Sequence, residues 1–291
     1  MPELPEVEHL RRTLAAVLPG RRVVRAVLHR GDMCAMPKGR AAGARALLKG
    51  GVFVAPARHG KQLALVTKDG RALRVHLGMT GQLFVLGRGR TPPRPDHVHA
   101  EWVLDDGSRM LFRDPRRFGG MAAYATLDAL RAAEWSPLGP DALTIEANSL
   151  GAALRGTRRA VKAALLDQAV LAGVGNIYAD ESLFAAGIHP CRRADRLGAA
   201  EVSRLCGTIR ATLTRAVEAG GSTLRDYVDG NGAPGGYQRS RLVYGRSGEA
   251  CPTCRTALRV TRVAQRTTVY CRACQPRTGR RPISRFSTSS A

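Results

Sequence analysis

The N-terminal residues place apolar side chains at the spacing of an α-helix. These positions recur every three or four residues, at Val7, Leu10, Leu14, Val17 and Leu18. In a helix they form a single stripe that can face a core. Pro5 suits a first helical turn, and the acidic Glu6 and Glu8 favour the positive end of the helix dipole. The pattern predicts an amphipathic helix near the N-terminus.

Short segments rich in β-forming residues follow this helix. They span residues 22–28, 51–54, 62–67, 72–77, 82–86, 97–104, 109–112 and 121–123. Turn signals such as Lys68-Asp69-Gly70 separate them. Many short strands with tight turns favour an antiparallel sandwich or barrel. The Pro- and Arg-rich residues 87–95 indicate an exposed loop between two of these strands.

The pattern changes from strands to helices near residue 130. Pro137, Gly139 and Pro140 indicate a linker, and the helical patterns that follow cover residues 150–154, 159–168, 178–186 and 199–219. The glycine-rich residues 220–236 are typical of a mobile loop. After Gln275 the chain is basic and rich in Ser and Thr, which favours a disordered tail.

The charge of the chain indicates a polyanionic partner. Its 291 residues include 46 Lys and Arg but 23 Asp and Glu, which gives a net charge of +23 and a pI near 11.1. An excess of this size favours nucleic acid, although a GC-rich genome that encodes many arginines would explain part of it. The sequence shows neither a membrane span nor a signal peptide. We expect a cytoplasmic protein.

The strongest spacing signal is two cysteine pairs separated by sixteen residues: Cys251, Cys254, Cys271 and Cys274. This spacing is typical of a four-cysteine zinc site. We predict one structural Zn²⁺ in a closed tetrahedral site, with residues 258–262 and 267–270 forming a β-hairpin between the pairs. Arg266 falls at the tip of that hairpin, where its guanidinium can match a phosphate.

Two disulfides are the alternative to zinc. The remaining three cysteines are scattered, at Cys34, Cys191 and Cys206. An odd total with scattered thiols fits a reducing compartment better than a disulfide framework.

The first residues also carry a candidate nucleophile. The sequence begins Met1-Pro2-Glu3-Leu4-Pro5-Glu6-Val7-Glu8, and a methionine before a small residue is usually removed. The exposed α-amine of Pro2 would have a pKa of roughly 7.7–8.0, so a fraction of it is nucleophilic near neutral pH. A helix start explains Pro5 and the acidic residues, but it does not require Pro2 and Glu3.

Four further segments each have an ordinary structural explanation. Lys61 would be a solvated lysine at a strand entry, and Met79 in residues 77–81 would lie in a core. Residues 113–119 read as a β-turn with solvated arginines. Gly173 and Gly175 precede a predicted helix, where they form either a tight turn or a set of free N–H groups that can bind phosphate.

Taken in order, these motifs resemble those of formamidopyrimidine-DNA glycosylases, from Met1 to about Gln275. The resemblance implies a bifunctional enzyme of base excision repair that acts on damaged double-stranded DNA. It removes oxidised purines (8-oxoguanine and formamidopyrimidines) through a Schiff base on Pro2, and β,δ-elimination then cuts the strand. Glu3 would move protons, and Lys61 and Arg266 would assist the elimination steps.

The same resemblance assigns residues that bind DNA. Met79 and Phe118 would enter the helix where the damaged base has left, and Arg116 would bond the orphaned cytosine. Residues 158–188 resemble the helix–two-turns–helix element of the family. The residues that would hold the backbone of the damaged strand are Arg158, Lys162 and Asn176.

The chain departs from the family pattern in three places. Pro95 stands before Asp96-His97-Val98, where the family often has His, which puts one DNA contact in doubt. Gly235-Gly236-Tyr237 shifts an aromatic within the loop 222–240, which puts the lesion preference in doubt. The tail after Gln275 extends past the usual end of the family and would add non-specific attraction to DNA.

We therefore predict an α+β protein. Its parts are a catalytic N-terminal β-sandwich (1–132), a linker (133–146), a helix–two-turns–helix domain with the lesion loop (147–241), a zinc finger (242–275) and a basic disordered tail (276–291). DNA would lie in a basic cleft between the two lobes. We expect a bacterial, nucleoid-associated monomer without a small-molecule cofactor.

Two alternatives remain. One is the related glycosylase that acts on oxidised pyrimidines, against which Leu4 and Phe118 argue. The other is a non-catalytic zinc-ribbon protein that binds nucleic acid, against which Pro2, Glu3 and Lys61 argue.

Overall fold

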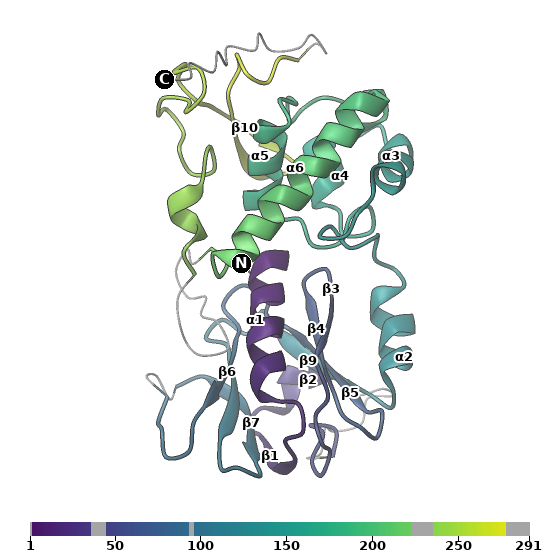
Figure 1. The fold of residues 1–291 in the computed structure, drawn as a ribbon, viewed down its shortest axis with the longest axis vertical. Coiled ribbons are helices and arrows are strands. Elements are labelled where there is room, and N and C mark those ends of the chain that lie inside the picture. Colours follow the sequence, from purple (N-terminus) through teal and green to yellow (C-terminus); the bar gives the residue numbers. More distant parts are fainter. Residues whose placement is uncertain (1, 36–44, 93–95, 223–234, 278–291) are drawn as a thin grey trace, which may run out of the picture. The chain divides into compact units, whose positions relative to one another are not determined.

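The computed structural model describes residues 2–35, 45–92, 96–222 and 235–277. The chain divides into two compact units (Figure 1). The first contains residues 1–139 and 214–240, and the second contains residues 140–213 and 241–291. The described residues 214–222 and 235–240 thus belong to the first unit, so the segment 147–241 is divided between the two units. Among the described residues, no helix combines the length and apolar character needed to cross a bilayer.

The first unit begins with the predicted amphipathic helix, α1 (Leu4–Val17), drawn in purple in Figure 1. Glu3 is its N-cap, and the backbone N–H of Glu3 donates to Oε2 of Glu6 at 2.7 Å. This bond is one half of a capping box, which satisfies a donor that a helix start would otherwise leave free. The apolar stripe of α1 is buried, at Val7, Leu10, Leu14 and the following Leu18.

Two sheets form the β-sandwich. The first has four antiparallel strands, in the order β1 (Val23–Leu28), β7 (Val98–Leu104), β8 (Arg109–Arg113) and β6 (Gln82–Leu86). The second has the order β2 (Cys34–Ala35), β9 (Gly120–Tyr124), β5 (Ala72–His76), β4 (Gln62–Val66) and β3 (Ala57–His59). All its pairs are antiparallel except β2 with β9.

One apolar core joins α1 and strands of both sheets. It includes Leu10 and Leu14 of the helix, Leu63 of β4 and the fully buried Trp102 of β7, whose indole donates to the carbonyl of Leu47 at 2.8 Å. Residues 51–54, expected as a strand, form only isolated bridges. Val52 bridges to Arg22 and Phe53 bridges to Thr67, so neighbouring residues pair with different segments and no continuous strand forms.

Short helical elements complete the first unit. They are η1 (Gly31–Met33), α2 (Leu127–Leu130), the π-helical turn η3 (Arg131–Trp135) and η5 (Tyr237–Ser240). Thr126 caps α2, because its hydroxyl accepts the N–H of Ala129 at 3.0 Å.

The second unit is helical and carries a two-stranded sheet. Its elements are α3 (Ala147–Arg155), α4 (Val161–Leu166), α5 (Asn176–Ala185), η4 (Ala194–Arg196), α6 (Ala199–Glu218), β10 (Arg259–Val263) and β11 (Arg266–Tyr270). The last turns of α6, from Thr214, are grouped with the first unit. The α+β class and the hairpin between the cysteine pairs are confirmed.

Candidate active site and zinc module

The N-terminal segment is buried where the candidate nucleophile begins. Pro2 is buried, and Glu3 is 3% exposed. Glu6 is 1% exposed, and its second oxygen, Oε1, accepts the N–H of Ser222 at 2.7 Å. One carboxylate therefore joins the start of α1 to the residue at the start of the glycine-rich segment. Sequence reasoning gave Glu6 only a role in starting the helix, because its spacing reveals the capping box but not the contact with Ser222.

The backbone at residues 221 and 235 passes close to this contact. Gly221 has a φ of +79°, and a Cβ at this position would lie 2.8 Å from Cγ of Glu6. A Cβ on Gly235 would lie 2.4 Å from the carbonyl oxygen of Gly221. Both glycines are therefore required where residues 221 and 235 meet beside α1. Tyr237 is the aromatic residue whose position in the loop departs from the family pattern. It is buried, and its N–H donates to Gly221 O at 3.0 Å.

Lys61 lies in the two-residue turn between β3 and β4. His59 pairs with Gln62, and Gly60 supplies the left-handed conformation that such a turn needs, with a φ of +54°. The neighbouring strand places His76 opposite Gln62. Burial, together with the positive charges of Arg74 and Lys61, lowers the pKa of His76. His76 is therefore a neutral donor or acceptor beside Lys61, a residue that sequence reasoning missed because the register of β4 with β5 was not known.

The turns that carry Met79 and Phe118 are in direct contact. Gly78 has a φ of +59°, and a Cβ on it would lie 2.3 Å from the backbone carbonyl of Phe118. The buried carboxylate of Asp114 accepts hydrogen bonds from the hydroxyl of Thr80 and from the N–H of Gly119, the latter at 2.7 Å. These contacts fix the two turns against each other, so Met79 and Phe118 belong to one rigid platform.

The platform presents apolar surface to solvent. Met79 is 40% exposed and Phe118 is 53% exposed, which excludes the interpretation of Met79 as a core residue. The guanidinium of Arg116 lies over the ring of Phe118, 4.6 Å from its centroid. Exposed apolar side chains beside a planar cation are suited to stack on and bond to nucleic-acid bases.

Asn176 and Arg158 occupy the second unit. Asn176 is the first residue of α5, and its Nδ2 donates to the carbonyl of Thr267 at 3.1 Å. Gly173, with a φ of +113°, and the N-cap Gly175 lead into this helix. Arg158 lies between α3 and α4, and its side chain is exposed.

Lys162 does not lie where the sequence placed it. It is 0% exposed and forms an ion pair with Asp180, from Nζ to Oδ1 at 2.7 Å. Its ammonium also donates to Thr267 O at 3.1 Å and to Thr268 Oγ1 at 2.8 Å. The expectation that Lys162 touches the DNA backbone is therefore wrong for this conformation, because no atom of its side chain reaches the surface. It links α4 and α5 to strand β11.

Arg266 is exposed at the tip of the zinc hairpin, as predicted. Val263 pairs with Arg266, so Ala264 and Gln265 form a two-residue turn. Both have positive φ, +49° and +58°, which a type I′ turn requires but which side chains other than glycine and asparagine disfavour. The turn places Arg266 at the first position of β11, away from the core.

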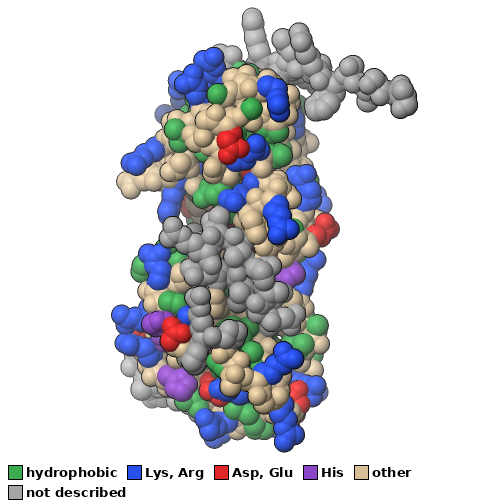
Figure 2. Space-filling view, turned by 90° about the vertical axis from the view of Figure 1, so that its left-hand side faces the viewer, with side chains coloured by type: hydrophobic (Ala, Val, Ile, Leu, Met, Phe, Trp, Pro, Cys, Tyr) green, Lys and Arg blue, Asp and Glu red, His purple; other side chains and the backbone are tan. Residues whose placement is uncertain are grey.

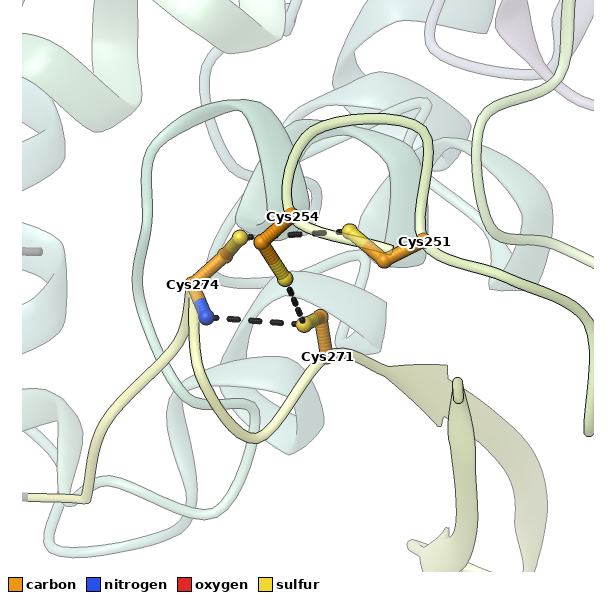
Figure 3. A group of neighbouring side chains, drawn as sticks. All are labelled: Cys251, Cys254, Cys271 and Cys274. Carbon is orange, nitrogen blue, oxygen red and sulfur yellow. Dashed lines mark hydrogen bonds between the residues drawn. The ribbon is translucent and has the colours of Figure 1, made fainter. Parts of the chain in front are cut away.

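The four predicted cysteines lie close together, one pair before β10 and the other pair after β11. Figure 3 shows their side chains pointing toward one another, and their sulfur atoms all lie within 4.8 Å of one another. The closest pairs are Cys254 with Cys271 at 3.4 Å and Cys251 with Cys274 at 3.9 Å. A tetrahedral zinc site with Zn–S bonds of about 2.3 Å has S···S edges of about 3.8 Å. The cluster therefore has the size of a Zn–S₄ site.

The pKa values of the cysteine thiols also favour a bound cation. Burial and the neighbouring sulfurs raise the pKa of Cys271 and Cys274, while hydrogen bonds from Thr256 outweigh burial and lower the pKa of Cys254 to about 6. A bound Zn²⁺ replaces the thiol protons and removes this repulsion. Because four thiolates close the coordination shell, the zinc is structural.

Several regions that the sequence singled out lie outside the described residues. These are Met1, Pro95, residues 223–234 of the glycine-rich loop and the tail from residue 278. Next to Pro95, His97 is described. It has a φ of +61°, and its Nε2 lies 3.1 Å from Oδ2 of Asp96.

Basic side chains are widespread on the surface. Figure 2 shows separate groups of Lys and Arg side chains, in blue, on the face it presents, with fewer acidic side chains, in red. This distribution follows from the net charge of +23 and favours contact with polyanions.

Three segments of the chain match known domain families. Residues 1–121 match the formamidopyrimidine-DNA glycosylase N-terminal domain, and residues 138–228 match the H2TH domain of the same enzymes. Residues 248–277 match a zinc finger found in FPG and IleRS. The zinc finger match and the four clustered cysteines agree on one structural zinc ion.

Curated relatives resemble the chain over nearly its whole length. The formamidopyrimidine-DNA glycosylase of Symbiobacterium thermophilum is 44% identical over 95% of this chain and 90% of its own. The protein of the same name from Stenotrophomonas maltophilia is 44% identical over 94% of this chain and 100% of its own.

Solved structures agree with these relatives. The MutM (FPG) protein of Thermus thermophilus is 38% identical, with a TM-score of 0.80, over 94% of this chain and 98% of its own. The Fpg of Lactococcus lactis, in a complex with DNA that contains an abasic site, is 30% identical, with a TM-score of 0.83, over 94% of this chain and 100% of its own. The chain belongs to the formamidopyrimidine-DNA glycosylase family.

Proposed function

We propose that the protein is a bifunctional DNA glycosylase and AP lyase of base excision repair. One observation carries this proposal: Pro2 and Glu3 directly precede α1 in the same unit as the exposed side chains of Met79, Arg116 and Phe118. A nucleophilic amine and a device that fills a gap in the duplex are the two parts that base excision through a covalent intermediate requires.

Pro2 acts as the nucleophile after Met1 has been removed. Its nitrogen attacks C1′ of the damaged nucleotide, and the bond from C1′ to the base breaks as the base takes up a proton. The Pro2 nitrogen loses its proton, the C1′–O4′ bond breaks as O4′ takes up a proton, and the nitrogen lone pair forms the C1′=N⁺ iminium ion. The iminium acidifies the neighbouring C2′–H, so loss of that proton expels the 3′ phosphate, and a second elimination expels the 5′ phosphate. Hydrolysis releases the enzyme.

Three residues assist these steps. Glu3, beside Pro2, is the proton shuttle for sugar opening and base loss. Lys61, in the turn that ends β3, assists proton transfer at the sugar and phosphates of the flipped nucleotide. Arg266, exposed on the zinc hairpin, holds a phosphate during elimination, because its planar guanidinium can form two parallel bonds to it.

Five of the remaining assigned residues contact DNA, and Lys162 supports them. Met79 and Phe118 fill the gap left by the flipped nucleotide, and Arg116 bonds the Watson–Crick edge of the orphaned cytosine. Asn176 and Arg158 contact the backbone of the damaged strand. Lys162 acts indirectly, because its ammonium holds Thr267 and Thr268 of the strand that begins with Arg266.

The substrates are oxidised purines, 8-oxoguanine and formamidopyrimidines, in duplex DNA. The names of the relatives support this class, since proteins 42–44% identical to this chain are formamidopyrimidine-DNA glycosylases. A Lactococcus lactis structure holds DNA that contains Fapy-dG. We further propose that the protein is a monomer in the bacterial cytoplasm, associated with the nucleoid, and that it needs no small-molecule cofactor.

A panel of duplex oligonucleotides tests this function. Each would carry 8-oxoguanine, formamidopyrimidine or thymine glycol, and both base release and strand cleavage would be measured. We expect release of the two purine lesions and cleavage on both sides of the sugar, with both activities lost in Glu3→Gln. Faster release of thymine glycol would identify the pyrimidine-specific alternative. Tight binding with no release of any base would identify a non-catalytic zinc-ribbon protein.

A further inference from the structure

Three arginines converge on one buried carboxylate of α1. Glu8 is 5% exposed and accepts four hydrogen bonds, each 2.9 Å long. Two come from Arg11, one comes from Arg12 and one comes from Nε of Arg58. Arg11 and Arg12 lie on the same helix as Glu8. Arg58 lies fifty residues away in the sequence, on strand β3.

The guanidinium of Arg58 also binds the turn that carries Lys61. Its side chain is 7% exposed, and while Nε binds Glu8, Nη1 donates to the carbonyl of Gly60 at 2.8 Å. That carbonyl belongs to the peptide bond between Gly60 and Lys61. A continuous chain of hydrogen bonds therefore runs from α1 through one guanidinium to the backbone of Lys61.

The opposite side of the same turn is held by His59. Its Nε2 lies 2.9 Å from the carbonyl oxygen of Gly139, and its ring stacks on Trp135 with centroids 5.8 Å apart. The turn is thus fixed at both residues that precede Gly60, and Lys61 follows immediately. The Arg58 contact connects it to the helix whose N-terminus carries Pro2 and Glu3.

In a buried ion pair such as that of Glu8 with Arg58, desolvation offsets part of the attraction between the two charges. Its geometry is nonetheless specific, since a guanidinium presents its donors in a fixed plane. We propose that Glu8 and Arg58 are positioning residues that hold Lys61 in register with the nucleophile helix. This inference rests on the proposed role of Lys61 in the reaction.

The experiment compares Arg58→Gln with the matched control Arg12→Gln. Both variants remove one guanidinium partner of Glu8, but Arg12 is 53% exposed and lies on α1 itself rather than on the strand that leads to Lys61. Single-turnover excision and strand cleavage would be measured on a duplex that contains 8-oxoguanine. We expect Arg58→Gln to slow the reaction about tenfold to a hundredfold, because small misplacements of a catalytic group have effects of this size. Arg12→Gln should stay within about twofold of wild type.

The Lys61→Ala background distinguishes a positioning role of Arg58 from a general loss of protein stability. In Lys61→Ala, Arg58→Gln should cause no further loss of rate, because no lysine remains to be positioned. Its effect on thermal unfolding should persist in both backgrounds. Arg58→Lys, which keeps the charge but loses the planar fork, provides a folded variant if Arg58→Gln does not fold, and it should show the same non-additivity.

Three outcomes would overturn the proposal. Arg58→Gln and Arg12→Gln could have equal rates, or the loss caused by Arg58→Gln could be the same with and without Lys61. If Lys61→Ala is slow and either of these two results is found, only the positioning role of Arg58 is rejected. A normal rate in Lys61→Ala rejects the role of Lys61 in the proposed function, and the positioning role with it, while excision itself would remain intact.

Discussion

The buried carboxylate of Asp114 accepts a hydrogen bond from the hydroxyl of Thr80, which joins the turn of Met79 to the turn of Phe118. The same carboxylate binds the N–H of Gly119 at 2.7 Å. A single acidic residue thus organises both parts of the platform. The positions of Met79 and Phe118 therefore depend on two buried side chains, Asp114 and Thr80.

Thr80→Val should loosen the platform. The substitution keeps the shape of the side chain but leaves Asp114 without one of its donors, which costs about 1–3 kcal/mol of unfolding free energy. Excision from duplex DNA should slow, because Met79 and Phe118 lose their fixed relation. Thr126→Val is the control, since it removes the cap of α2 at a cost of about 1 kcal/mol. If both variants excise equally well at equal stability, the platform does not need this bond.

Phe118→Ala should separate base flipping from folding. The ring is 53% exposed, so its removal should change the melting temperature little. The rate of excision from duplex DNA should fall strongly, whereas single-stranded DNA, which has no stacked partner to replace, should lose less. Val24→Ala is the control, because Val24 is 46% exposed on β1. Unchanged duplex excision in Phe118→Ala would contradict the role of the ring as a wedge.

Glu8 should make folding sensitive to acid. Burial alone would raise its pKa, but hydrogen bonds from Arg11, Arg12 and Arg58 outweigh burial and lower the pKa from 4.5 to about 2. Because the folded pKa is the lower one, the stability that Glu8 contributes is complete above the unfolded pKa and is lost as the pH falls toward 2.

Urea unfolding of wild type and Glu8→Gln tests this dependence. The difference in unfolding free energy should be larger at about pH 5 than at about pH 3. Asp32→Asn should show little difference, since the Asp32 side chain is 55% exposed and its ion pair with Arg30 is screened by solvent. A constant difference for Glu8→Gln across this range would show that the carboxylate does not titrate as described.

Removal of zinc should unfold the C-terminal module. A strong chelator, or Cys254→Ser, takes away the bonds that hold the two cysteine pairs together. We expect loss of the β10–β11 hairpin and weaker DNA binding, because Arg266 loses its support. Cys191→Ser lies outside the cluster and should keep both zinc and binding. Retention of hairpin structure after complete zinc release, measured by circular dichroism and metal analysis, would contradict a structural role.

The sequence predicted those parts of the fold that local patterns encode. The stripe of α1, the strands between tight turns and the cysteine spacing each carry their own signal, and the zinc cluster is confirmed. The strand expected at residues 51–54 was not found as a regular strand, because Val52 and Phe53 pair singly with two different segments, at Arg22 and Thr67. Local patterns do not report such contacts.

The contacts of the candidate-site residues could not be predicted from local patterns either. Lys162 carries a charge that suits DNA, but its distant partner Asp180 draws it into the interior. Glu6 reads as a helix-start residue, while its second contact is with Ser222, more than two hundred residues away. Arg58 likewise contacts Glu8 of α1, fifty residues away, and His76 comes to lie opposite Gln62 only through strand pairing. Side chains whose roles depend on contacts across the fold could not be assigned from their own neighbours.

Trapping and locating the covalent intermediate shows whether the Pro2 nitrogen is the nucleophile. Borohydride would be added during turnover on a duplex that contains 8-oxoguanine, and the reduced protein–DNA adduct would be mapped by mass spectrometry. We expect one adduct on the nitrogen of Pro2, in chains that lack Met1, and none in a Pro2→Gly variant whose N-terminus is acetylated. Excision without any adduct, or an adduct on Lys61, would contradict this assignment.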